Sequence, residues 1–109
     1  MKENFHWKEA EREKILGCLA RSLAGRDKGE LFVILGGEGE YLYLADGRYR
    51  TAAKPKRKKK KHAQLIFVKQ DEIFEKLREG RPVYDAEIKT FIRCFKRENQ
   101  VIGSRHEDR

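Results

Sequence analysis

The fold is decided by residues 17–34, GCLARSLAGRDKGELFVI, in which two apolar runs flank a glycine-bearing loop. We expect strands at residues 16–22 and 30–35, and the second is the most apolar stretch of the chain. Gly25 and Gly29 bracket the loop between them. Because glycine adopts positive φ without a steric penalty, a sharp reversal is predicted here. The segment is therefore predicted to form a strand–loop–strand unit.

Three more strands are expected downstream, which makes a small, mainly β unit of about five strands. Residues 36–39, GGEG, predict a turn into a strand at residues 41–45, and Asp46-Gly47 is a strong two-residue hairpin signal. Residues 48–51 alternate cations with Tyr49 and Thr51, as a half-exposed strand does. The closing strand is expected at residues 62–68.

Residues 54–61, KPKRKKKK, form a basic arm between the last two expected strands. This arm holds seven of the 26 cations, so the net charge of +8 is concentrated in it and the rest of the chain is nearly neutral. Like charges repel one another, and we expect an extended loop that stays mobile until it is neutralised. Such a concentration of positive charge favours a polyanionic partner.

The flanks of the β unit are expected to be helical or polar. Asp71 is a candidate cap for a short helix at residues 72–79, and Gly80 ends it. Asp85 is expected to open a second short helix that packs on the β unit through Ile88, Phe91, Ile92 and Phe95. The chain of 109 residues is divided into a charged leader at 1–14, a β unit at 15–68, a helical cap at 69–96 and a polar, frayed tail at 97–109.

Several classes of function are disfavoured by the sequence. Cys18 and Cys94 have no CxxC or CxH spacing, so no zinc site, other metal or disulfide framework is expected. Cys18 and Ser22 have no identifiable catalytic base, and the GGEG segment lacks the ending of a phosphate-binding loop. The leader has no apolar run of the kind found in signal peptides or membrane spans. We therefore expect a cytoplasmic protein that is not an enzyme and has no cofactor, small-molecule substrate or membrane partner.

Residues 17–34 resemble the KOW motif of ribosomal proteins and NusG-type transcription factors. The likeness extends through the order of the later segments. With these included, the chain resembles bacterial KOW-domain RNA-binding proteins that look like large-subunit ribosomal proteins of archaea and eukaryotes. It covers residues 17–68, about half of the chain. The resemblance implies an SH3-like β-barrel that contacts RNA, usually ribosomal, or occasionally protein. The residues that carry it are Ser22, residues 24–29, residues 45–47, residues 54–58 and His62.

The expected RNA contacts are the cations of the arm and those of the barrel loops. If about five of the seven arm cations engage phosphates, log K should fall with log salt with a slope of roughly −3.5 on single strands. Tyr41, Tyr43 or Tyr49 could stack on unpaired bases, although a small barrel also needs tyrosines in its core. The candidate RNA-binding residues are Arg21, Arg26, Lys28, Arg48, Arg50, Lys54, Lys56, Arg57, Lys58, Lys59, Lys60, Lys61 and His62.

Structural roles compete with binding roles at some of these positions. Gly25 and Gly29 are expected to be conformational, and His62 could be structural. Arg26 and Lys28 could contact phosphate or pair locally with Asp27, which lies between them. The arm could also be a solubilising loop, an import signal or a patch for anionic membranes, but RNA is favoured.

The expected function is that of an RNA-binding protein, ribosome- or translation-associated, that contacts ribosomal RNA and has ribosomal or translation proteins as further possible partners. The alternative is a KOW protein-interaction module of the transcription or translation machinery, which docks through its helices or a strand edge. If Ile88, Phe91, Ile92 and Phe95 are exposed, the alternative gains support, and if they seal the β unit, it loses support.

Overall fold

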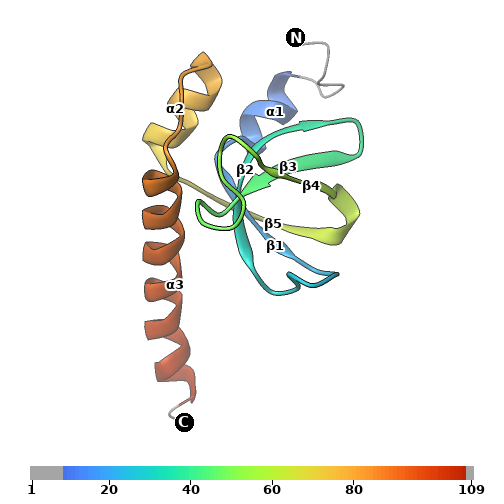
Figure 1. Cartoon of the computed structure of the whole chain (residues 1–109). Coiled ribbons are helices and arrows are strands. Elements are labelled where there is room, and N and C mark those ends of the chain that lie inside the picture. Colours follow the sequence, from blue (N-terminus) through green and yellow to red (C-terminus); the bar gives the residue numbers. More distant parts are fainter. Residues whose placement is uncertain (1–8, 108–109) are drawn as a thin grey trace.

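The computed structural model describes residues 9–107, with side chains described for residues 10–99 (Figure 1). Residues 1–8 of the expected leader lie outside the described residues. The chain folds as an α+β protein with one five-stranded antiparallel sheet. Its elements are α1 (Glu9–Ile15), β1 (Cys18–Ser22), β2 (Leu31–Glu38), β3 (Tyr41–Ala45), β4 (Lys56–Lys59), the 3-10 helix η2 (Lys60–His62), β5 (Ala63–Lys69), α2 (Asp71–Glu79) and α3 (Asp85–Glu107).

The strand order is β4-β3-β2-β1-β5, so β1 to β4 form a meander and β5 returns to pair with β1. β4 and β5 are the two edges of the sheet, yet only the three residues of η2 separate them. The edges of a flat five-stranded sheet would be about 19 Å apart. The chain from Lys59 to Ala63 reaches at most about 14 Å. The sheet is therefore strongly curled.

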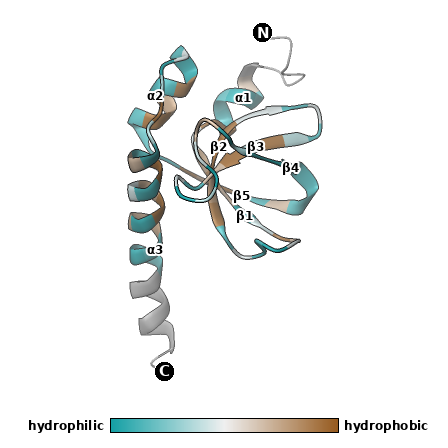
Figure 2. Cartoon of the chain, viewed as in Figure 1, coloured by the Kyte–Doolittle hydropathy of each residue, from teal (hydrophilic) through white to brown (hydrophobic). Residues whose placement is uncertain are grey.

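The curled sheet has an apolar residue set on each face. Along β1, Cys18 and Ala20 point to the inner face, whereas Leu19 between them points outward, as the period of two requires. α2 and α3 cover the outer face of β1 and β2, and Figure 2 shows apolar residues in these elements but hydrophilic residues along β4. The inner cluster is Ile15, Cys18, Ala20, Phe32, Ile34, Leu42, Leu44 and Ala63, and the outer cluster is Leu19, Leu31, Val33, Ala45, Ile73, Val83, Ile88 and Ile92.

The α+β fold class and four of the five strands are confirmed. β1, β2, β3 and β5 lie within three residues of their predicted limits, because each contains a short apolar run bounded by turn residues or polar residues. Gly25 and Gly29 have φ of +88° and +91°, which gives the predicted reversal between β1 and β2.

The predicted strand at residues 48–51 is wrong, because this segment folds back on a side chain instead of pairing. Asp46 Oδ1 accepts the backbone N–H groups of Arg48 at 2.9 Å and Arg50 at 2.8 Å. The backbone N–H groups of Asp46 and Gly47 donate to the carbonyl of Arg50. These bonds make a compact loop that follows β3.

The prediction of a loop at residues 54–61 is also wrong for residues 56–61. Residues 56–59 form β4, which pairs with β3 in the register Leu42↔Lys58 and Tyr43↔Arg57, and residues 60–62 form η2. The self-repulsion that predicted a loop is offset, because two of the lysines face a carboxylate described below.

The helices differ from prediction in length and capping. α3 continues to Glu107, so the second helix is long and residues 97–107 are not a frayed tail. α2 is capped by Gln70, whose side chain accepts the N–H of Ile73 at 2.7 Å, and Asp71 is its first residue. The end at Gly80 is confirmed, with φ of +74°. Residues 9–14 of the expected leader, together with Ile15 from the start of the expected β unit, form α1, and Ile15 joins the inner cluster.

Candidate nucleic-acid interface

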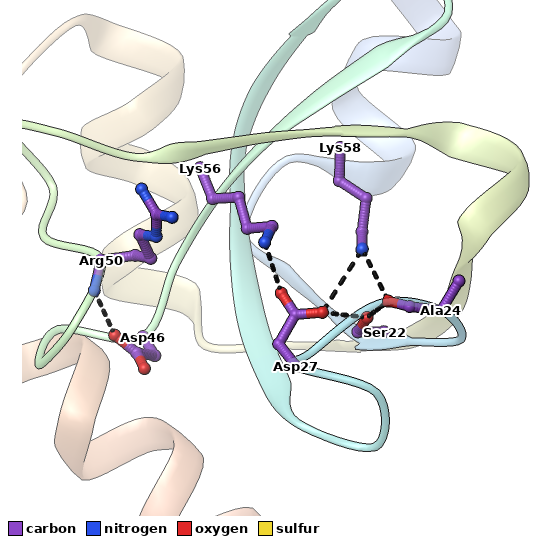
Figure 3. A network of polar contacts seen from close by, with 7 residues as sticks. All are labelled: Ser22, Ala24, Asp27, Asp46, Arg50, Lys56 and Lys58. Atoms are coloured by element: carbon purple, nitrogen blue, oxygen red, sulfur yellow. Dashed lines mark hydrogen bonds and ion pairs between the residues drawn. The ribbon is translucent and has the colours of Figure 1, made fainter.

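A polar network joins the loop between β1 and β2 to β4 (Figure 3). Asp27 lies in this loop and accepts a hydrogen bond from the hydroxyl of Ser22 at 2.6 Å. Its carboxylate also lies 2.8 Å from Nζ of Lys56 and 3.4 Å from Nζ of Lys58. Lys58 in turn donates to the carbonyl of Ala24 at 3.0 Å. The network therefore fixes the loop against the edge strand of the sheet.

The electrostatics of this network favour an ionised Asp27. Its side chain is only 16% exposed, and this partial burial by itself raises the pKa of the carboxyl group. Hydrogen bonds from Lys56 and Ser22, with the charges of Lys56 and Lys58, outweigh burial and lower the pKa of Asp27 to about 2. The Lys58 side chain is 9% exposed, so Asp27 is the counter-charge that makes its burial possible.

The two faces of β4 have different environments. Lys56 and Lys58 are opposite Leu44 and Leu42 in β3, and therefore point to the inner face. Arg57 alternates with them and points outward, where its guanidinium lies 4.2 Å from the centroid of the Tyr41 ring. Residues 56–59 of the basic arm thus form a strand in which Lys56 and Lys58, paired with Asp27, alternate with Arg57 and Lys59 on the opposite face.

We call the basic side chains of this region that lie outside the Asp27 network the basic edge: Arg57, Lys59, Lys60, Lys61 and His62. Arg57, Lys61 and His62 are exposed, and Lys59 and Lys60 are half-buried. The backbone N–H of Lys60 donates to the carbonyl of Glu40 at 2.7 Å, and the carbonyl of His62 accepts the N–H of Leu23 at 2.9 Å. These bonds hold the cations on ordered backbone.

The tyrosines differ in their availability for stacking. The Tyr41 ring is half-buried and carries the guanidinium of Arg57. The hydroxyl of Tyr43 donates to Glu38 at 2.5 Å, and this hydrogen bond raises the pKa of Tyr43. Tyr49, in contrast, is 81% exposed. Among the three candidates, Tyr49 is the ring that a base could reach most easily.

A second positively charged surface lies between the loop after β3 and α3. We call it the α3 groove, and its volume is about 290 Å³. Leu31 and Ile92 contribute apolar groups to it, and cations from both segments outnumber the carboxylates. The lining residues are Glu30, Leu31, Asp46, Arg48, Tyr49, Lys89, Ile92, Arg93 and Lys96.

Three of these cations, Lys89, Arg93 and Lys96, were not predicted as site residues. Their spacing of four and three residues places them on one side of a helix, which is a signal that the sequence contains. Only the apolar side of this helix was used in the prediction. That α3 crosses beside Arg48 and Tyr49 could not be predicted from spacing alone.

The remaining predicted site residues are distributed around these surfaces. Arg21 donates from Nη1 to the carbonyl of Gly29 at 3.1 Å and shares a shallow hollow with Lys96. Arg26 and Lys28 are exposed at the tip of the β1–β2 loop, where Asp27 pairs with β4 lysines. Arg50 and Lys54 are exposed on the segment between β3 and β4.

Three features of the described residues bear on a metal site, a thiolate nucleophile and a membrane-spanning helix. Residues 9–107 contain no group of three or more His, Cys, Asp or Glu side chains placed to hold a metal ion. Burial raises the pKa of the Cys18 thiol, which disfavours a thiolate nucleophile. None of the helices in this range is both long and apolar enough to cross a membrane.

Comparison with known proteins gives no assignment by similarity. The sequence matches no model of a protein family and none of the curated proteins.

Proposed function

We propose that this protein binds RNA, and that the basic edge supplies most of the phosphate contacts. The observation that carries the proposal is the alternation along β4. Asp27 pairs with both inward lysines, Lys56 and Lys58, while Arg57 and Lys59 lie on the opposite face of the same strand. A row of cations on ordered backbone binds polyanions with little loss of conformational entropy.

Besides Lys56 and Lys58, which pair with Asp27, residues 54–61 contain five cations: Lys54, Arg57, Lys59, Lys60 and Lys61. Neutralising five phosphates of a single strand gives a slope of log K against log salt of roughly −3.5. Contacts of this kind position an RNA but do not read its sequence. Affinity should therefore depend strongly on salt and only weakly on base composition.

We further propose that the curled sheet is an SH3-like barrel of the KOW type and that the RNA is ribosomal. The support for the barrel is that η2 links the two edge strands and that the glycine-bearing loop between β1 and β2 is held by Ser22 and Asp27. The support for ribosomal RNA is the resemblance of residues 17–68 to KOW proteins. A role in translation in the cytoplasm follows from the same resemblance.

A module that docks proteins through its helices is the less favoured function. Ile88 is fully buried, Ile92 is 7% exposed, and Phe91 and Phe95 pack against the outer cluster. The burial of these residues against the sheet disfavours docking of a partner through this side of α3.

The test is fluorescence anisotropy with a labelled ribosomal RNA hairpin in low salt. The charge-removal variant is Arg57→Gln/Lys61→Gln, which removes two exposed cations of the basic edge. Arg78→Gln/Arg81→Gln, at the end of α2 and just after it, is the matched control, because both arginines are exposed and their removal changes the net charge equally. We expect about ten-fold weaker binding for the first variant and less than a two-fold change for the control.

If both variants bind RNA equally weakly, the basic edge is not the main site of phosphate contact. Such a result would indicate that RNA is attracted by the net charge of the protein alone. Absence of binding by the wild-type protein in low salt would contradict RNA binding itself.

A further inference from the structure

Tyr49 is the most exposed large hydrophobic side chain in the described part of the chain, at 81%. It lies in the loop between β3 and β4, and the guanidinium of Arg48 lies 5.5 Å from its ring centroid. An aromatic ring left in solvent beside a cation is suited to a planar, anionic ligand. The ring also lines the α3 groove.

The loop that carries Tyr49 is held from two sides. Asp46 Oδ1 accepts the N–H groups of Arg48 and Arg50, which flank Tyr49 in the sequence. Asp85, the first residue of α3, accepts the N–H of Ala52 at 2.8 Å. The loop is therefore ordered before any ligand arrives, and this reduces the entropy lost on binding.

Gly47 brings the same loop into close contact with α3. A Cβ atom at this position would lie 2.5 Å from the carbonyl oxygen of Asp85 and 2.9 Å from Cγ of Lys89. Only glycine permits this approach at φ of +80°. The approach places Tyr49 beside the cationic side of α3.

The groove combines an apolar floor with an excess of positive charge. Leu31 and Ile92 are buried apolar residues that line it. Its four cations are opposed by two carboxylates, and one of these, Asp46, is already bonded to backbone N–H groups. The four cations are Arg48, Lys89, Arg93 and Lys96.

We propose that the α3 groove binds an unpaired nucleotide of a single-stranded RNA segment, with its base stacked on Tyr49 and its flanking phosphates on the groove cations. Every base has a π-face, so stacking on an aromatic ring does not depend on sequence. In a duplex, the bases are stacked on one another and cannot reach the ring. The inference rests on the proposed function, because the nucleotide belongs to the RNA that the basic edge binds.

Tyr84 provides a matched control for Tyr49. It is also exposed, at 61%, and a lysine, Lys76, lies 5.1 Å from its ring centroid. Lys76 is paired with Glu87, so its charge is already neutralised. Tyr84 does not line the α3 groove.

The experiment measures the affinities of a 12-nucleotide single-stranded RNA and of a blunt duplex of the same sequence. We expect Tyr49→Ala to weaken single-strand binding about ten-fold, within the range that loss of one base–aromatic stack produces. Tyr49→Phe should restore single-strand affinity to within two-fold of wild type. Duplex binding, and both affinities of Tyr84→Ala, should stay within two-fold of wild type. A single 2-aminopurine in the strand should lose fluorescence on binding to wild type but less on binding to Tyr49→Ala.

The outcomes separate the two proposals. If the wild type binds RNA and Tyr49→Ala binds single strands with unchanged affinity, the proposed nucleotide site in the α3 groove is wrong. The proposal that the basic edge binds RNA is unaffected by that result. Equal losses for single strand and duplex also overturn stacking. If wild type binds neither RNA, the proposed function fails and the groove fails with it.

Discussion

Lys56 Nζ lies 2.8 Å from Oδ2 of Asp27, which joins the edge strand β4 to the loop between β1 and β2. Lys58, two residues further along β4, pairs with the other oxygen of the same carboxylate. The sequence of residues 54–61 suggests that all of its cations are available to a polyanion. Two of them, Lys56 and Lys58, are instead paired with Asp27 within the protein. Substitutions in this run should therefore have two different kinds of effect.

Asp27→Asn should destabilise the fold. It removes the negative charge opposite Lys58, whose side chain is 9% exposed, and leaves a buried ammonium group without a counter-charge. We expect a loss of about 2–3 kcal/mol in the free energy of unfolding, measured by urea denaturation. Glu30→Gln, an exposed carboxylate at the end of the same loop, should change it by less than about 0.5 kcal/mol. Similar effects of the two substitutions would contradict the role of Asp27.

The depressed pKa of Asp27 predicts a specific loss of stability in acid. Its pKa in the folded state is about 2, below the ordinary value of 3.8, so folding favours the ionised form. The resulting stabilisation, about 2 kcal/mol, is complete above about pH 5 and is lost progressively as the pH falls through the unfolded and folded pKa values toward about pH 1. Urea denaturation at a series of pH values should show this loss in wild type and a smaller one in Asp27→Asn. Parallel pH profiles for the two proteins would contradict the assignment.

Neighbouring lysines of β4 should separate stability from binding. Lys58→Ala should lower the free energy of unfolding by about 1–2 kcal/mol, because it removes one of the two lysines paired with Asp27 and opens a gap beside Leu42. Lys59→Ala, on the opposite face, should change stability by less than about 0.5 kcal/mol and weaken RNA binding. Equal effects of both on stability would indicate a loop instead of a strand.

Gly47→Ala should be more damaging than Gly29→Ala, although both glycines have positive φ, at +80° and +91°. At Gly29, nothing lies within 4 Å of an added Cβ, so only backbone strain of about 1 kcal/mol is expected. At Gly47, the added atom meets the carbonyl of Asp85 at 2.5 Å, and the loop must leave α3. We expect a loss of about 2–3 kcal/mol by urea denaturation. Equal losses at the two positions would contradict the close approach of loop and helix.

Local patterns in the sequence were sufficient for the elements that bury apolar residues with a regular period. The strands flanking Gly25 and Gly29 and the helix that ends at Gly80 were predicted on this basis. The strand predicted at residues 48–51 is wrong because the alternation of residue types does not reveal that the Asp46 carboxylate accepts the backbone N–H groups of Arg48 and Arg50. The strand at residues 56–59 was missed because the counter-charge for Lys58 comes from Asp27, 31 positions away in the sequence.

Only part of the candidate site could be predicted from the sequence. Cations of the basic edge follow from composition, since a dense positive run attracts polyanions wherever it lies. The α3 groove depends on tertiary contact between Gly47 and Lys89, which no spacing rule reveals. Lys89, Arg93 and Lys96 share a helix side, but that side gains a role only beside Tyr49.

The most direct test of RNA binding is the salt dependence of the wild-type affinity for single-stranded RNA, measured by anisotropy from about 50 to 300 mM KCl. The account predicts a linear fall of log K with log salt and a slope of roughly −3.5, made shallower by about 1.4 in Arg57→Gln/Lys61→Gln. A slope near zero, or no binding at 50 mM KCl, would contradict it.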